Sequence, residues 1–148
     1  MAQADFNILQ RVWRHASLSR FKKIEIFNAC ICSKLSYGLF TAAFTAKEKR
    51  RLDGFQARCL RRVLRIPHSY YSRISNCTVL QTAGETPLSE KLLAQKMSYM
   101  TKVVNRCSDD PVRNFMFEEG SLLLCNNNIK RARGRPRITW APEVYDAY

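Results

Sequence analysis

Apolar residues recur along this chain with the three-to-four-residue spacing of amphipathic helices, and the alternation typical of strands is weak. The spacing predicts a first short helix over residues 5–16. A second, longer helix is predicted from about Arg20 to Phe40 or beyond, with Ser17 or Ser19 as its N-cap. Because the second helix is apolar nearly all round after its first turn, we expect it to be central.

A third helix is predicted from Thr45, where a capping box with Glu48 satisfies free backbone amides, to about Ile66. Pro67 stops it because proline lacks the amide donor that a helix needs. One face of this helix is apolar and should contact the core. The residues of this face are Leu52, Phe55, Cys59, Val63 and Ile66.

Two further helices are predicted in the second half of the chain. The first spans residues 76–83 and ends at Gly84, and the second has Thr86 as N-cap and Pro87 in its first turn. The second helix continues to about Cys107. Its core-facing residues are Leu88, Leu92, Tyr99 and Val103, with Met100 beside them.

A last short helix is predicted to start at Asp109 or Asp110 and to end near Glu118. The sequence therefore predicts an all-α fold, an irregular bundle of about five to six helices with an extended basic C-terminal tail. We expect a helical domain over residues 1–119 and an irregular tail over residues 120–148.

The chain carries 25 Lys and Arg residues against 12 Asp and Glu, a formal net charge of +13 over 148 residues. Such an excess predicts a polyanionic partner, with nucleic acid ahead of an anionic membrane. The most apolar stretch, residues 24–44, contains charged and small residues and predicts a buried helix rather than a membrane span. Without a signal-peptide pattern at the N-terminus, an intracellular and nuclear location is expected.

Basic residues occupy the side of the third helix opposite its apolar face. A solvated helix face normally mixes both signs of charge, whereas Glu48 and Asp53 are the only acidic residues here, which favours a polyanion-facing surface. In the following loop, Tyr70 and Tyr71 could stack on unpaired bases or pack on the core. The candidate nucleic-acid-binding residues of this region are Lys47, Arg51, Arg58, Arg61, Arg62, Arg65 and Arg73.

A second basic cluster lies in the segment Lys130–Arg137, where Gly134 and Pro136 exclude a helix. An extended cationic segment suits a phosphate backbone or the narrow minor groove of A·T-rich DNA. Its Arg-Gly-Arg-Pro sequence matches the core of an AT-hook, and the alternative is a solvated tail. Ile138 and Trp140 could anchor its end on the helical body. The candidate binding residues here are Lys130, Arg131, Arg133, Arg135 and Arg137.

Several short motifs follow one another in a fixed order along the chain. They are Leu9 and Trp13; Ser17-Leu18 with Lys22-Lys23; Tyr37-Gly38; the block Phe55–Ile66; Thr82-Ala83-Gly84 with Pro87-Leu88-Ser89; and Arg133–Trp140. In this order the chain resembles, over about residues 5–140, the region that follows the polymerase core in non-LTR (LINE-type) retrotransposon reverse transcriptases, especially the retrotransposable-element group. It lacks the Leu-Arg-Trp-Leu-Gly-His block of that family, and Gln95–Met100 stands in its place.

The resemblance implies a thumb-like and linker region that grips an RNA–DNA hybrid or duplex DNA behind the polymerase active site. It implies no catalysis here, because the paired aspartates of the family lie upstream of this region. Polymerases hold two Mg²⁺ ions with such aspartates at a strand turn, whereas Asp109-Asp110 precedes Pro111 between helices and is interpreted as a cap. We therefore predict a non-enzymatic nucleic-acid-binding fragment. The alternatives are a decayed element without activity, an AT-hook-type DNA-binding protein and an anionic-membrane binder.

No metal or cofactor site is predicted, and the oligomeric state stays open. Structural zinc needs four ligands at close, paired spacings. Cys30 and Cys32 point to nearly opposite sides of a helix, and His15 and His68 have no partners at such spacings. Free thiols are expected at all six cysteines, with buried structural thiols, rather than metal ligands, as their role. They are Cys30, Cys32, Cys59, Cys77, Cys107 and Cys125.

Overall fold

The computed structural model describes residues 2–15, 17–118, 120–125 and 140–147, and this part of the chain confirms the all-α fold. It has more helices than the five or six predicted. The first predicted helix divides at Leu9 into two, and several short helices lie between the longer ones. The elements are α1 (Ala2–Ile8), α2 (Gln10–His15), α3 (Arg20–Phe27), the π-helical turn η1 (Asn28–Cys32), α4 (Ser33–Ser36), the 3₁₀ turn η2 (Leu39–Thr41), α5 (Ala46–Leu64), α6 (Ser69–Ser72), α7 (Asn76–Ala83), α8 (Leu88–Val104), α9 (Pro111–Met116) and α10 (Trp140–Tyr145).

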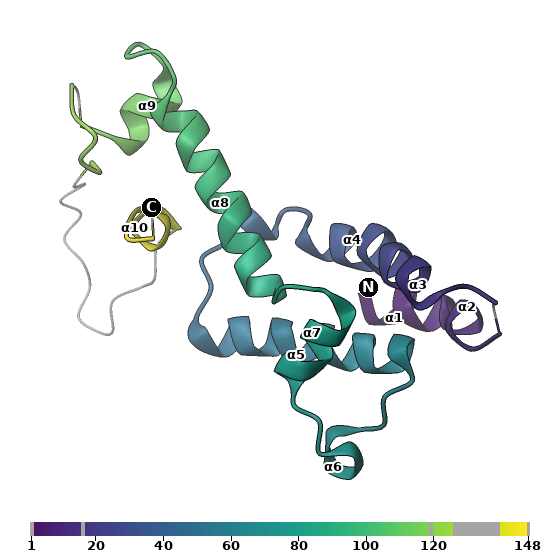
Figure 1. Ribbon diagram of the computed structural model, residues 1–148. Helices are drawn as coiled ribbons and strands as arrows, with labels where there is room; N and C mark the ends of the chain where they lie inside the picture. The colour runs from purple at the N-terminus through teal and green to yellow at the C-terminus, as the bar shows by residue number, and fades with distance from the viewer. Residues whose placement is uncertain (1, 16, 119, 126–139, 148) are drawn as a thin grey trace.

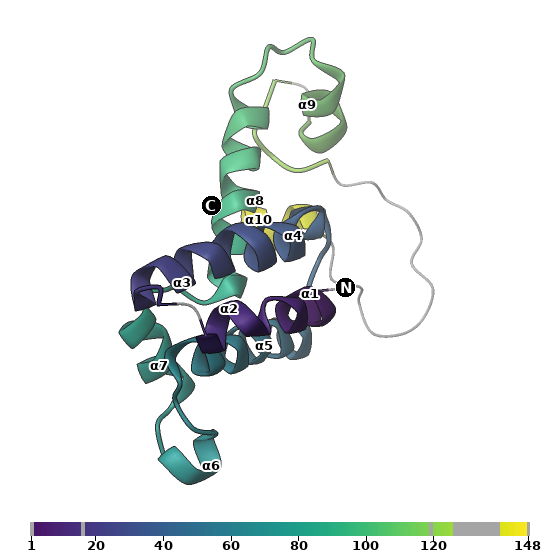
Figure 2. The same ribbon diagram turned by 90° about the vertical axis from the view of Figure 1, so that its right-hand side faces the viewer.

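Helix α5 is the hub of the molecule, since it packs against α3, α7 and α8 (Figures 1 and 2). Helix α8 leads away from it and carries α9 at its far end. The short helix α6 projects at the opposite end of the molecule in both views. Helix α10, which is close to the C-terminus, lies against α8 although a long stretch of sequence separates the two.

The first core lies between α5 and the N-terminal helices. Phe6 and Trp13 stack with ring centroids 5.6 Å apart, and Phe27 meets Phe6 edge-on at 6.2 Å. Ser19 caps α3 through the amide of Lys22, which confirms one of the two N-caps proposed for this helix. The helices around the core bury Phe6, Trp13, Ile24, Phe27, Ile31, Cys32, Cys59, Leu60, Val63, Leu64, Val79, Leu80 and Leu88.

The prediction of one long, central helix over residues 20–40 is wrong in two respects. Its helical part ends at Ser36, and Gly38 then adopts a φ of 76°, which favours glycine because it has no Cβ. Cys30, Ser33 and Lys34 are exposed, so one side of this helix faces solvent and the helix packs on one side of α5 instead of lying at the centre. The density of apolar residues indicated burial but could not show which helix the others would surround.

Helix α5 has the predicted start and the predicted apolar face. The Thr45 hydroxyl accepts from the Glu48 amide, and the Glu48 carboxylate accepts from the Thr45 amide, so the capping box is confirmed. Cys59 and Val63 are buried, and the other three predicted core residues are partly buried against them. The helix ends at Leu64, two residues earlier than predicted, because Arg65 adopts the left-handed conformation.

Side chains of α5, rather than Thr86, cap the start of α8. The Gln56 side chain is fully buried; it accepts from the Leu88 amide at 2.8 Å and donates to the Thr86 carbonyl at 3.0 Å. The Asp53 carboxylate accepts from both the amide and the hydroxyl of Ser89. The predicted Thr86 cap is therefore wrong: Pro87 holds the N-cap position, and tertiary contacts satisfy the free amides.

The second core joins the C-terminal half of α8 to α9 and α10. Its fully enclosed residues are Met100, Val103, Phe117 and Val144. Helix α10 corrects the prediction that residues 120–148 are irregular, because residues 140–145 are helical and pack on α8. A six-residue helix is unstable alone, so docking rather than local sequence stabilises it.

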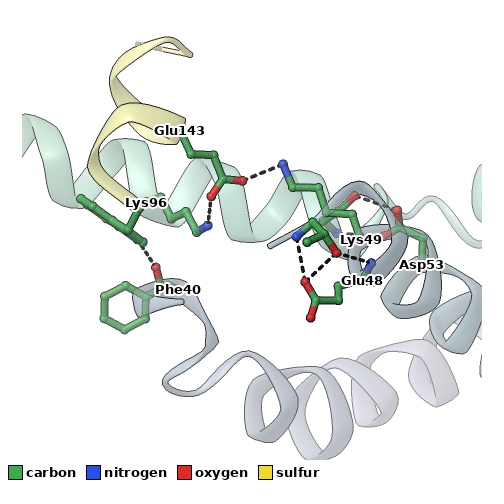
Figure 3. Close-up of polar contacts among 9 residues, drawn as sticks. Phe40, Glu48, Lys49, Asp53, Lys96 and Glu143 are labelled. Atoms are coloured by element: carbon green, nitrogen blue, oxygen red, sulfur yellow. Dashed lines mark hydrogen bonds and ion pairs between the residues drawn. The ribbon is translucent and has the colours of Figure 1, made fainter. Parts of the chain in front are cut away.

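Trp140 anchors α10, in agreement with its proposed role, while Ile138 lies outside the described residues. The Trp140 indole Nε1 donates to the Phe40 carbonyl at 2.5 Å (Figure 3). The Trp140 ring lies edge-on to the Tyr99 ring, with centroids 5.9 Å apart. This contact joins η2, α8 and α10.

A buried ion pair adds to this docking. Figure 3 shows the Glu143 carboxylate between Lys96 and Lys49, at 2.9 and 2.7 Å. The Lys96 side chain is only 2% exposed, and its ammonium also lies 5.1 Å from the centroid of the Phe44 ring. Burial alone would raise the pKa of Glu143, but hydrogen bonds from Lys49 and Lys96 outweigh it and hold this pKa below its ordinary value.

We predict that Glu143→Gln destabilises the protein by up to about 3 kcal/mol at neutral pH, because it leaves the Lys96 ammonium buried without a counter-charge. Urea denaturation measures the change. Folding lowers the pKa of Glu143, so its ionised carboxylate stabilises the folded state. This contribution to the free energy of unfolding is complete at a pH above the ordinary pKa of a glutamate. It is lost as the pH falls through the lower pKa of the folded state. The wild type and the variant should therefore converge in acid.

The exposed Asp146, on the same segment, supplies the control Asp146→Asn, which should change stability by less than about 0.5 kcal/mol. The double variant Lys96→Met/Glu143→Gln should recover most of the loss, because an apolar side chain replaces the buried charge. A double variant as unstable as Glu143→Gln alone would contradict this explanation.

Candidate nucleic-acid interface

Three of the predicted cations form an exposed row along α5, and we call Lys47, Arg51 and Arg58 the α5 row. Their spacing of four and seven residues places them on one helix face over about 16 Å. None of them forms an ion pair within the described part of the chain. The Arg58 Nε donates to the Gly54 carbonyl at 3.3 Å, which directs the side chain back along the row.

Arg61 was predicted to share this exposed face, and that prediction is wrong. The residue is 5% exposed, and the segment that follows α5 folds back over it. Its guanidinium donates to the carbonyls of Pro67 and Ile74 at 3.2 and 2.6 Å. It also reaches the Ser72 hydroxyl and the Asn76 side-chain oxygen. Arg61 therefore bonds the chain just before α6 and the chain just after α6 to helix α5.

Arg62 and Arg65 lie on the flank of α5 that faces α1 and α2. The Arg62 guanidinium is 6.0 Å from the centroid of the Phe6 ring. Arg65 has a φ of 59° and donates to the Arg14 carbonyl at 2.8 Å, near the C-terminus of α2. A cation is favourable at that end of a helix. The structure thus separates these two arginines from the α5 row.

An open hollow of about 490 Å³ lies beside the α5 row, and we call it the basic groove. Gly54 lies between Arg51 and Arg58 in the sequence and contributes to the lining, and a Cβ at this position would meet nothing within 4 Å. The rest of the lining comes mainly from residues after Pro67, which no periodicity in the sequence could place here. The lining residues are Arg51, Gly54, Arg58, Arg61, His68, Ser69 and Asn76.

Helix α6 presents its two tyrosines to solvent, so they do not pack on the core. Tyr70 and Tyr71 are 75% and 79% exposed, and their rings meet edge-to-face with centroids 5.4 Å apart. The predicted site residue Arg73 ends this helix in the left-handed conformation, with a φ of 56°, and is exposed.

The predicted binding residues of the basic tail lie outside the described residues. These are Lys130, Arg131, Arg133, Arg135 and Arg137. The described chain resumes at Trp140.

Asp110 acts as a helix cap, as predicted. Its carboxylate accepts from the amides of Val112 and Arg113 and pairs with Arg106. Desolvation opposes the charged form, but these hydrogen bonds outweigh it and keep the pKa of Asp110 below its ordinary value. In the described ranges, no group of three or more His, Cys, Asp or Glu side chains could hold a metal ion.

The six cysteines are free thiols, but only Cys32 and Cys59 are buried. Burial raises the pKa of Cys32 to about 11 and that of Cys59 to about 12. Cys30 points outward while Cys32 points inward, as the helical spacing predicted. The expectation of burial is wrong for Cys30, Cys77 and Cys107, which are exposed.

The chain matches no protein-family model, no curated protein and no solved structure. The resemblance to reverse transcriptases therefore stays a prediction from the quoted motifs. Among the helices that the structure describes, none has the length and apolar character needed to cross a membrane.

Arg61→Met should destabilise the protein by about 2–4 kcal/mol, because the carbonyls of Pro67 and Ile74 would lose their donor inside the fold. Arg58→Met, on the exposed side of the same helix, is the matched control and should change stability by less than about 0.5 kcal/mol. Urea denaturation measures both. Equal stabilities of the Arg61→Met and Arg58→Met variants would show that the hydrogen bonds of Arg61 do not stabilise the fold.

Proposed function

We propose that this chain is a non-enzymatic nucleic-acid-binding module that grips the backbone of duplex DNA or an RNA–DNA hybrid along α5. The observation that carries the proposal is the basic groove, whose lining includes the exposed residues Arg51 and Arg58 together with Gly54. Neither arginine forms an ion pair with a described carboxylate. Both guanidinium groups are therefore available for phosphate.

Geometry and charge favour phosphate as the ligand. Duplex DNA carries one charge per about 3.4 Å of each strand, so the α5 row, about 16 Å long, runs past several phosphates. A concave surface lined by one sign of charge also focuses the potential and attracts a polyanion. The net charge of +13 adds long-range attraction to this local surface.

The motif resemblance supports a more specific form of the proposal. In that form, the chain corresponds to the thumb-like and linker region behind the polymerase core of a non-LTR retrotransposon reverse transcriptase. Its role is then to hold template and primer, in the nucleus, without a catalytic aspartate pair of its own. The use of Asp110 as a helix cap is in keeping with a non-catalytic role.

We predict that Arg51→Gln/Arg58→Gln weakens binding to duplex DNA and makes it less dependent on salt. Each phosphate contact contributes about 0.9 to the slope of log K against log salt concentration, so the loss of two contacts should lower the slope by about 2. Fluorescence anisotropy titrations over a salt series measure this slope.

The matched control is Arg20→Gln/Lys102→Gln, which removes the same charge from exposed residues of α3 and α8. We expect a much smaller change in slope for this control. If the two double variants behave alike, net charge rather than the basic groove is responsible, and the proposed site is wrong.

A further inference from the structure

Helix α6 places two exposed aromatic rings next to the basic groove. His68 and Ser69 line the groove, and Tyr70 and Tyr71 follow them directly in the chain. We propose that these tyrosines stack on an unpaired base, so that the preferred ligand is a nucleic acid with a junction between duplex and single strand. This inference rests on the proposed function and names the ligand class of the same site.

Exposure alone does not distinguish the tyrosines, because Phe21, Tyr37 and Phe115 are at least 76% exposed as well. Among the described residues, however, Tyr70 and Tyr71 are the pair of exposed aromatic side chains that are adjacent in the chain and contact each other. Adjacent exposed rings are a common stacking platform for single-stranded nucleic acids, because every base has a π-face. The charge of the adjacent groove favours nucleic acid over an apolar protein partner.

The geometry of the pair limits what it can hold. The two rings are nearly perpendicular, with an interplanar angle of 88°, so they cannot both lie parallel to successive stacked bases. One ring offers an open face while the edge-to-face contact supports it. A single unpaired base fits this arrangement better than a long single strand.

Helix α6 is held in place by contacts within the protein, without a ligand. Arg61 bonds the carbonyls of Pro67 and Ile74, which lie on either side of α6. The Ser72 hydroxyl donates to the Pro67 carbonyl, and the His68 ring accepts from the Tyr70 amide. These contacts hold the backbone of α6 in place next to the groove that His68 and Ser69 line, which reduces the entropy lost on binding.

Three probes separate stacking from charge. They are a blunt DNA duplex, the same duplex with a short adenine overhang, and that duplex with an overhang of equal length made of abasic sites. The last two carry the same phosphates and differ only in the bases. Overhangs at the 3′ and the 5′ end are compared, and affinities are measured by competition so that no dye lies near the junction.

We expect the wild-type chain to bind the adenine overhang about 5-fold to 100-fold more tightly than the abasic overhang, as stacking on one base allows. Tyr70→Leu/Tyr71→Leu should abolish this preference and leave the affinity for the blunt duplex unchanged. Tyr70→Phe/Tyr71→Phe should keep it, because the rings remain. Tyr37→Leu is the matched control, since Tyr37 is 89% exposed at the end of α4, far from α6 (Figures 1 and 2).

Equal wild-type affinity for the adenine and abasic overhangs would overturn the inference, as would a preference that survives the double leucine variant. Circular dichroism confirms that the variants are folded, which surface substitutions of exposed side chains should permit. The proposed function fails by a different result, namely an unchanged salt slope in Arg51→Gln/Arg58→Gln on the blunt duplex.

Discussion

The architecture depends on one constraint: polar backbone groups buried against α5 must find partners, and the side chains of α5 supply them. Gln56 and Asp53 bind the turn that starts α8, and Arg61 binds the chain on both sides of α6. These bonds determine where the chain goes after it leaves α5. Apolar contacts then close the core around the helix, but they are not directional, so on their own they would leave the orientation of these turns open.

The same constraint distinguishes the buried cations of the described residues from the exposed α5 row. Arg61 and Lys23 bond to backbone carbonyls inside the fold, and Lys96 pairs with Glu143. These charged groups are satisfied by partners inside the fold, where an unpaired cation would be destabilising. The α5 row forms no ion pair in the described structure, and its members are exposed beside the groove, with Arg58 bonded only to the Gly54 carbonyl of its own helix. The net charge alone therefore does not locate the surface at which a polyanion would bind.

The C-terminal segment shows how distant parts of the sequence become one unit. Trp140 reaches the Phe40 carbonyl, and Glu143 joins Lys49 on α5 to Lys96 on α8. Helix α10 thus ties the end of the described chain to the hub helix and to the second core. Helix α6 lies away from this segment, at the end of the molecule opposite α9, and the Arg61 side chain bonds the chain on both sides of it to α5. Substitutions in the two segments should act on separate properties, stability and ligand preference.

The sequence alone determined the all-α class and the capping box at Thr45, and it narrowed two further caps to Ser17 or Ser19 and to Asp109 or Asp110, because these follow from contacts between residues close in the chain. The structure selects Ser19 and Asp110. Helical periodicity also identified the apolar face of α5. Only the tertiary structure decided that Arg61 is buried, that Lys96 is enclosed with Glu143, and that residues 140–145 form a helix. Each of these depends on a partner many residues away, and periodicity carries no information about which distant segment will cover a given side chain.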